Sequence, residues 1–140
     1  MGEVLGSFLV KLDEKGRIIL PSKTRAGLAG GVYLTIGQDL CLYAFSADQL
    51  DRYIRLSQGE ETKTVVPSAF ERLFKASVVT QTPDKQGRII IAPALRRHAG
   101  LERELIVIGL GHRLEIWDVA RWQAYQEANL GQFTQAGLAQ

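Results

Sequence analysis

Cysteine, histidine and long apolar runs are all scarce in this chain of 140 residues. Its single cysteine, Cys41, rules out an internal disulfide framework, and no cysteine or histidine cluster has the spacing of a zinc site. Apolar runs such as residues 105–110 are strand-sized and far shorter than a membrane span. The first residues lack the basic and apolar regions of a signal peptide. We therefore expect a cytoplasmic protein with no cofactor, no metal and no membrane partner.

The net charge is also small, at +2, but the basic residues are unevenly placed. In residues 11–25, five basic side chains outnumber two acidic ones, and in residues 84–97 four outnumber one. Each segment thus carries a net charge of +3, and the rest of the chain carries −4. A polyanion responds to local charge, so these two segments could bind nucleic acid, although a solvated basic face would look the same.

The same two segments contain an internal repeat. The sequence D-E-K-G-R-I-I-L at residues 13–20 returns 71 residues later as D-K-Q-G-R-I-I-I at residues 84–91. Each copy has an aspartate that can cap a four-residue turn, a glycine that tolerates a left-handed backbone, and an aliphatic strand. The repeat predicts two similar hairpins, arranged as a pseudo-dimer within one chain.

Turn and capping signals divide the chain into two halves. We expect a first repeat at residues 4–57, a linker with a short helix at 58–76, a second repeat at 77–129, and a tail at 130–140 that frays after Asn129. Capping boxes at Ser46/Gln49 and Ser68/Glu71, and a capping aspartate at Asp118, predict three helix starts. The expected strands are residues 7–12, 17–20, 32–36, 40–45, 77–82, 88–91, 104–108 and 113–117, with short helices at 21–27 and 93–99.

Each half therefore has the element order ββαββα and belongs to the α+β class. About 60 residues can scarcely build an independent core, so the strands of the two halves should interleave into one shared sheet or barrel.

The two turns, together with the segment from Leu114 to Trp117, resemble the MraZ family, which belongs to the AbrB-like swapped-hairpin group. The resemblance runs from about Val4 to Tyr125. It implies two tandem AbrB-like repeats that form a pseudo-dimeric swapped-hairpin β-barrel with peripheral helices. It also implies a nucleoid-associated transcriptional regulator of the division and cell-wall gene cluster. Such a regulator binds direct repeats in promoter DNA as a homo-oligomeric ring of eight or more subunits.

The resemblance places the DNA-binding residues in the two turns. It assigns Lys15 and Arg17 to the first turn and Arg88 to the second, and we add Lys85 and Lys11 as candidate backbone contacts. An arginine after a turn glycine can reach a phosphate or a guanine edge. The alternative is that each arginine pairs with the preceding aspartate and only pins the turn.

The two copies also differ. Gln86 stands where the first turn has Lys15, and Pro93 lies one place later than Pro21. These differences favour the first turn as the stronger DNA contact and the second as scaffold and subunit joint. The arginines four residues after each proline, Arg25 and Arg97, are expected in salt bridges or subunit contacts rather than on DNA.

The remaining polar residues do not predict an enzyme, because no nucleophile–base pair, metal cluster or phosphate loop is present. Asp13 and Asp84 fit turn caps better than catalytic acids or magnesium ligands, and residues 109–111 fit a hairpin turn. We expect His98 and His112 to be structural, Cys41 to be buried, and Trp117 and Trp122 to anchor a core or an interface. The competing hypothesis is an AbrB-like, antitoxin-type protein-interaction module, which the short, weakly apolar tail disfavours.

Overall fold

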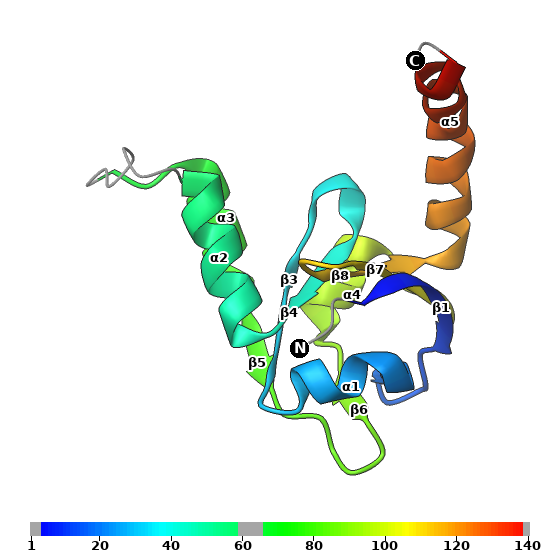
Figure 1. Cartoon of the computed structure of the whole chain (residues 1–140). Coiled ribbons are helices and arrows are strands. Elements are labelled where there is room, and N and C mark those ends of the chain that lie inside the picture. Colours follow the sequence, from blue (N-terminus) through cyan, green and yellow to red (C-terminus); the bar gives the residue numbers. More distant parts are fainter. Residues whose placement is uncertain (1–3, 59–65, 139–140) are drawn as a thin grey trace.

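The structure is a computed structural model that describes residues 4–58 and 66–138, so residues 59–65 of the expected linker lie outside the described part. Figure 1 shows the path of the chain, with strands and helices of both halves gathered around one sheet. The first half contains β1 (Leu5–Lys11), β2 (Arg17–Ile19), α1 (Ser22–Leu28), β3 (Val32–Ile36), the 3-10 turn η1 (Gln38–Leu40), β4 (Leu42–Phe45) and α2 (Ala47–Gln58). After α3 (Ala69–Ala76), the second half contains β5 (Val79–Gln81), β6 (Arg88–Ile90), α4 (Pro93–Ala99), β7 (Glu104–Leu110), β8 (Leu114–Asp118) and α5 (Val119–Leu138).

The predicted helix starts are confirmed by their capping hydrogen bonds. Ser46 and Gln49 form a reciprocal capping box at α2, in which the Gln49 amide donates to Ser46 Oγ at 3.2 Å and the Ser46 amide donates to Gln49 Oε1 at 3.0 Å. The Glu71 amide donates to Ser68 Oγ at 3.0 Å, and the Ala120 amide donates to Asp118 Oδ2 at 3.2 Å. These short polar signals fix where α2, α3 and α5 begin.

The strands of the two halves interleave, as their small size predicts. A six-stranded sheet has the order β1-β7-β8-β4-β3-β5, and β2 pairs with β6 in a separate two-stranded ribbon. Exchanging each strand for its counterpart in the other half reproduces the same order, so the pairing has pseudo-twofold symmetry. The expected closed barrel is not formed. The six-stranded sheet is open, with β1 and β5 as edges, because β2 and β6 pair with each other instead of closing it.

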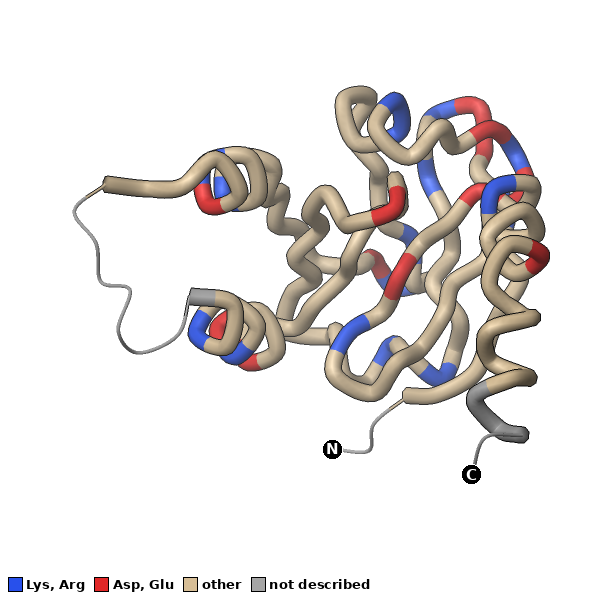
Figure 2. The backbone as a smooth tube through the Cα atoms, turned by 90° about the horizontal axis from the view of Figure 1, so that it is seen from above, with Lys and Arg blue, Asp and Glu red and all other residues tan. Residues whose placement is uncertain are grey.

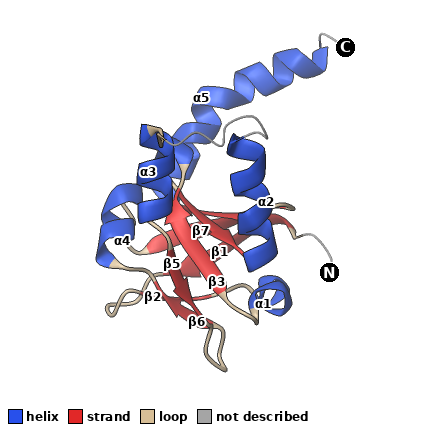
Figure 3. Cartoon of the chain, turned by 90° about the vertical axis from the view of Figure 1, so that its left-hand side faces the viewer, coloured by secondary structure: helices blue, strands red, loops and turns tan. Residues whose placement is uncertain are grey.

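Side chains alternate along the central strands and divide the core into two layers. One face of the sheet packs on the ribbon and on α1 and α4 through Ile18, Leu20, Ile89 and Ile91, which are nearly inaccessible to solvent. The other face carries an aromatic cluster around Phe45, covered by α2, α3 and the start of α5. Figure 3 shows α2 and α3 on one side of the sheet and β2 and β6 on the other. The ribbon is thus an outer layer with one buried and one open face.

The expected fraying after Asn129 is wrong, because α5 continues to Leu138. The side-chain Nδ2 of Asn129 donates to the Tyr125 carbonyl at 2.8 Å, and Thr134 Oγ1 donates to the Leu130 carbonyl at 3.0 Å, so both side chains bond to a carbonyl one turn back in the helix. Gln, Ala and Leu are adequate helix formers, and the segment has no proline. Within the described residues, no helix combines the length and the apolar character needed to cross a membrane.

Candidate nucleic-acid interface

The first repeated turn is built around the carboxylate of Asp13. Its Oδ1 accepts the backbone amides of Lys15 and Arg17, both at 2.9 Å, and its carbonyl accepts the Gly16 amide at 3.0 Å. Gly16 has φ = 79°, which few other residues adopt without strain. The Arg17 amide is the main cause that holds the pKa of Asp13 below its usual value. Asp13 is therefore a turn cap.

The second turn repeats this geometry. Asp84 Oδ1 accepts the amides of Gln86 and Arg88 at 2.9 Å each, and Gly87 again has φ = 79°. The pKa of Asp84 is also lowered, chiefly by the hydrogen bond from the Arg88 amide. In the described part of the chain, no three His, Cys, Asp or Glu residues lie together as a metal site.

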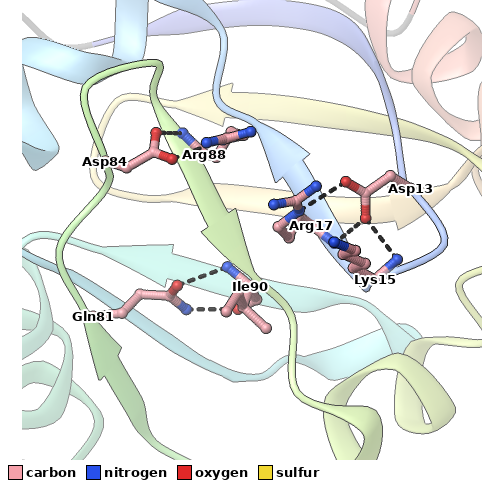
Figure 4. Close-up of polar contacts among 7 residues, drawn as sticks. All are labelled: Asp13, Lys15, Arg17, Gln81, Asp84, Arg88 and Ile90. Carbon is pink, nitrogen blue, oxygen red and sulfur yellow. Dashed lines mark hydrogen bonds and ion pairs between the residues drawn. The ribbon is translucent and has the colours of Figure 1, made fainter.

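Each arginine after the turn glycine pairs with its own aspartate. Arg17 Nε donates to Asp13 Oδ2 at 2.9 Å, and Arg88 Nε donates to Asp84 Oδ2 at 2.7 Å (Figure 4). Both side chains remain about one-third accessible to solvent. Within residues 4–58 and 66–138, Nη1 and Nη2 of these arginines have no hydrogen-bond partner. Because each arginine bonds to its aspartate through Nε, the outer edge of its guanidinium, Nη1 and Nη2, remains available to a ligand.

The β2–β6 ribbon brings both turns together. Its antiparallel register pairs Arg17 with Ile90 and Ile19 with Arg88, with Ile18 opposite Ile89 between them. Because successive side chains point to opposite faces and Ile18 and Ile89 are buried, both arginines lie on the open face. They are diagonal neighbours, with Cα atoms about 7–8 Å apart.

The predicted lysines, unlike Arg17 and Arg88, do not occupy equivalent positions in the two turns. Lys15 and Lys85 are both exposed in the turns, but a constant offset of 71 residues aligns Lys85 with Glu14, and Gln86 with Lys15. Lys11 is exposed at the end of β1 and is paired with Glu104 of β7 in the strand register. The structure thus places Lys15 and Lys85 in the exposed turns that precede Arg17 and Arg88, and Lys11 at the end of β1.

Two arginine side chains each contact the turn in the other half of the chain. Arg25 of α1 donates from Nε to the Leu20 carbonyl at 3.0 Å and packs on Gly87, where a Cβ atom would lie 2.8 Å from Arg25 Cζ. Arg96 of α4 packs on Gly16 in the same way, with its Cζ 3.1 Å from the Cβ position. Arg96 Nε is buried, and it has no hydrogen-bond partner in the described structure.

Aligning Pro93 with Pro21 in the sequence makes Arg97 the counterpart of Arg25. In the structure Arg97 is exposed, and Arg96 is the counterpart. The two short helices are equally long, and each begins at the same offset after its turn. Pro93 is the first residue of α4, whereas Pro21 precedes α1, so no insertion separates the copies. The offset of 71 residues between the two turns, applied to Arg25, identifies Arg96 from the sequence.

The other singled-out residues have structural roles. Cys41 is buried, and this burial raises the pKa of its thiol. The Trp117 ring is buried and donates from Nε1 to Glu115 Oε1 at 3.0 Å, and Trp122 packs against it with ring centroids 5.3 Å apart. His98 Nε2 lies 3.2 Å from the Gly37 carbonyl.

Comparison with known proteins identifies relatives along nearly the whole chain. A family model described as "MraZ protein, putative antitoxin-like" matches residues 4–73 and 75–137. A protein of Kocuria rhizophila is 44% identical over 131 residues, covering 94% of this chain and 92% of that protein. A protein of Arthrobacter sp. is 46% identical over 121 residues, covering 86% and 85%. Both relatives are named "Transcriptional regulator MraZ". The chain therefore belongs to the MraZ family, as the two D-x-x-G-R turns indicate.

Proposed function

We propose that this chain is a sequence-specific DNA-binding transcriptional regulator and not an enzyme, with the open face of the β2–β6 ribbon as its DNA-binding surface. The observation that carries the proposal is the placement of Arg17 and Arg88 on one face, each with a free outer guanidinium edge. The relatives' name, transcriptional regulator, supports the same role.

The ribbon has the right dimensions for the task, because the major groove of B-DNA admits a two-stranded β-ribbon. The free Nη1 and Nη2 atoms of an arginine can bind guanine O6 and N7 or a phosphate bidentately. The bond from Nε to the turn aspartate restricts the side chain before DNA arrives, which reduces the entropy lost on binding. Lys15 and Lys85, at the exposed turns, would contact phosphates, and Lys11 would add a weaker contact.

One subunit would bind DNA weakly. About three or four phosphate contacts per subunit would give a logarithmic salt slope of roughly −3, since each neutralised phosphate contributes about −0.9. We propose that tight binding comes from several subunits in one ring of eight or more that engage direct repeats in promoter DNA together. Linking weak sites in this way raises the effective concentration of each additional site.

Two apolar surfaces support this self-association. The α5 surface comprises Tyr125, Leu130 and Phe133, of which Phe133 is 77% exposed. The α2–α3 surface comprises Phe70 and Leu73 of α3 together with Val66, which precedes it, and Phe70 and Val66 border a hollow of about 370 Å³ that Tyr53 and Phe74 also line. Figures 1 and 2 show α5 and the α2–α3 pair at opposite ends of the molecule, and the part of α5 that follows Glu127 contains no charged residue.

Because these surfaces differ and point apart, a contact between them would be head-to-tail. Head-to-tail contacts generate rings when the rotation closes. We propose this contact for the ring, and we propose the chain's own promoter and the division and cell-wall gene cluster as targets, in the cytoplasm at the nucleoid.

The test compares DNA binding with oligomer mass. The double variant Lys15→Ala/Arg17→Ala should lose detectable binding to promoter DNA in a gel shift and keep the wild-type mass by light scattering. Wild-type gel shifts from this variant would remove the first turn from the DNA site. A duplex with one repeat should bind far more weakly than one with the intact array, and equal affinities would contradict binding through a ring.

A protein-interaction module of the antitoxin type is the second candidate. The sequence disfavours this candidate because the tail is short and weakly apolar. The structure favours it more, because the exposed Leu130 and Phe133 of α5 form an apolar helical face that a protein could cover. A stoichiometric protein partner in a pull-down, together with no DNA binding at low salt, would favour this alternative.

A further inference from the structure

Two isoleucines stand exposed in the middle of the proposed DNA-binding face. Ile19 of β2 is 51% accessible and Ile90 of β6 is 56% accessible, whereas the neighbouring Ile18 and Ile89 are almost fully buried. The repeat therefore uses isoleucine twice on each strand, once toward the core and once toward solvent. Burial explains the first isoleucine but gives no reason for the second.

The register places each exposed isoleucine directly opposite an arginine. Ile90 faces Arg17 and Ile19 faces Arg88, and the flanking hydrogen bonds from Leu20 N to the Gly87 carbonyl and from Ile91 N to the Gly16 carbonyl are both 2.8 Å. In the alternation of an antiparallel ladder, the Arg–Ile pairs occupy non-hydrogen-bonded positions, where side chains come closest, with Cα atoms about 4.5 Å apart. The open face thus carries two Arg–Ile pairs related by the pseudo-twofold axis.

The backbone of Ile90 is also held firmly. Gln81 of β5 clamps the backbone of Ile90, accepting its amide at 2.7 Å and donating to its carbonyl at 2.6 Å (Figure 4). A β-branched side chain in a strand has few rotamers, so the exposed methyl groups are presented in a nearly fixed position. A rigid apolar group beside a guanidinium is suited to shape recognition.

We infer that Ile19 and Ile90 determine sequence specificity by contacting the 5-methyl groups of thymines next to the guanines bound by Arg88 and Arg17. This inference rests on the proposed DNA-binding function. In the major groove, thymine is distinguished by its methyl group, which accepts apolar contacts, and guanine by O6 and N7, which accept bidentate arginine. Each Arg–Ile pair therefore recognises a guanine with a thymine beside it.

A protein contact at the same place is less favoured by the charges. A protein that covered Ile19 and Ile90 would also cover Arg17 and Arg88, and it would have to supply partners for both free guanidinium edges. The other large exposed apolar side chains lie mainly on α2–α3, α5 and the edge strand β1, outside the ribbon. DNA offers both the anionic and the methyl partner in one groove.

The test removes only the 5-methyl group of thymine from the DNA. The probe is a fluorescein-labelled duplex of the promoter upstream of the chain's own gene, shortened to the segment that the full-length protein protects from nuclease. Each thymine is replaced in turn by deoxyuridine, which lacks only the 5-methyl group, and affinity is measured by fluorescence anisotropy at fixed salt. For the wild type, deoxyuridine at the contacted thymines should weaken binding about fourfold per methyl group.

The matched variant is Ile19→Ala/Ile90→Ala, with Leu40→Ala as control because Leu40 is equally exposed but lies on the η1 turn, away from the ribbon. The ribbon variant should bind the thymine duplex more weakly and lose nothing further with deoxyuridine, whereas Leu40→Ala should behave as the wild type. Native mass spectrometry of each variant checks that the oligomer is unchanged.

Three results would overturn the inference. Deoxyuridine could have no effect on the wild type, it could have an equal effect on the wild type and the ribbon variant, or the ribbon variant could change oligomer mass without changing the deoxyuridine response. In all three, salt-dependent DNA binding would survive, so the proposed function would stand. If the wild type bound no promoter duplex even at low salt, the proposed function itself would fail, and the inference with it.

Discussion

At the scale of single residues, one aspartate organises each turn. Its carboxylate binds two backbone amides with one oxygen and the arginine Nε with the other, so the loop is shaped and the guanidinium aimed by the same group. These hydrogen bonds favour the ionised form and lower the pKa of Asp13 and Asp84 in the folded protein. The turns therefore depend on both carboxylates being charged.

This dependence predicts acid sensitivity of the turns. A group whose pKa is lowered on folding stabilises the protein fully above its unfolded pKa, about 3.9 for aspartate, and the contribution is lost as the pH falls through the lower folded value. NMR amide signals of Lys15, Arg17, Gln86 and Arg88 should shift together in this acidic window. In Asp13→Asn/Asp84→Asn, these amides should show no such titration; an unchanged titration would mean that another group is responsible.

The turn glycines give a second residue-scale prediction. Gly87→Ala should lower the free energy of unfolding by at least about 1 kcal/mol, since φ is positive and the new Cβ would meet Arg25. Gly16→Ala should cost somewhat less, because Arg96 lies slightly farther away. Gly30→Ala is the control, because no described atom outside the adjoining residues lies within 4 Å of its Cβ position. Urea unfolding curves measure all three, and equal stability of Gly87→Ala and Gly30→Ala would contradict the prediction.

At the scale of elements, α5 is a helix with a single apolar stripe that only partly meets the body. Trp122 and Phe133 are eleven residues apart, three full turns, so they share one face of the helix. Trp122 packs on Trp117, and Tyr125 lies 5.0 Å from the Trp117 ring between centroids, whereas Leu130 and Phe133 stay exposed. The distal half of the stripe is thus available to another molecule.

Charging this stripe should break the oligomer. Leu130→Asp/Phe133→Asp should shift the mass in light scattering to smaller species, because two carboxylates would have to be buried in the proposed contact. Phe70→Asp, on the α2–α3 surface, should act similarly. Ala124→Asp lies on the opposite face of α5 and should keep the wild-type mass. An oligomer that survives both surface variants would place the subunit contact elsewhere.

At the scale of the whole molecule, the strand exchange makes each half depend on the other. β1 of the first half is hydrogen-bonded to β7 of the second, and β5 of the second half to β3 of the first. The backbone geometry of the two turns is nearly the same, but their charges differ, because the first turn has Glu14 and Lys15 where the second has Lys85 and Gln86. The ranking of the turns remains a prediction.

Paired alanine substitutions test that ranking. We expect Lys85→Ala/Arg88→Ala to weaken promoter binding without abolishing it, whereas Lys15→Ala/Arg17→Ala should lose detectable binding, since Gln86 replaces the first turn's lysine. Lys85→Ala/Arg88→Ala should also make the salt slope shallower, by about 0.9 for each phosphate that the variant no longer neutralises. A larger effect from the second pair would show that the acid beside Lys15 matters more than the lysine itself.

Local features of this fold could be predicted from the sequence, and long-range ones could not. Asp13, Gly16 and the Ser46/Gln49 box act within a few residues, so their geometry follows from residue types. The ribbon's pairing and the open edges of the sheet depend on contacts between distant strands, which no local pattern specifies. For the same reason the sequence did not reveal the partners of Arg25 and Arg96, because Gly87 and Gly16 lie in the opposite half.

Because the two halves are joined in one polypeptide, their sequences can differ, and the two ends of the ribbon are not identical. A true twofold dimer presents identical ends and matches palindromic sites. Here Lys15 at one end has Gln86 as its counterpart, and Gln81, which clamps Ile90, has Val10 as its counterpart in β1. A bound chain would therefore distinguish the two directions along a duplex, and neighbouring copies would all have to face the same way.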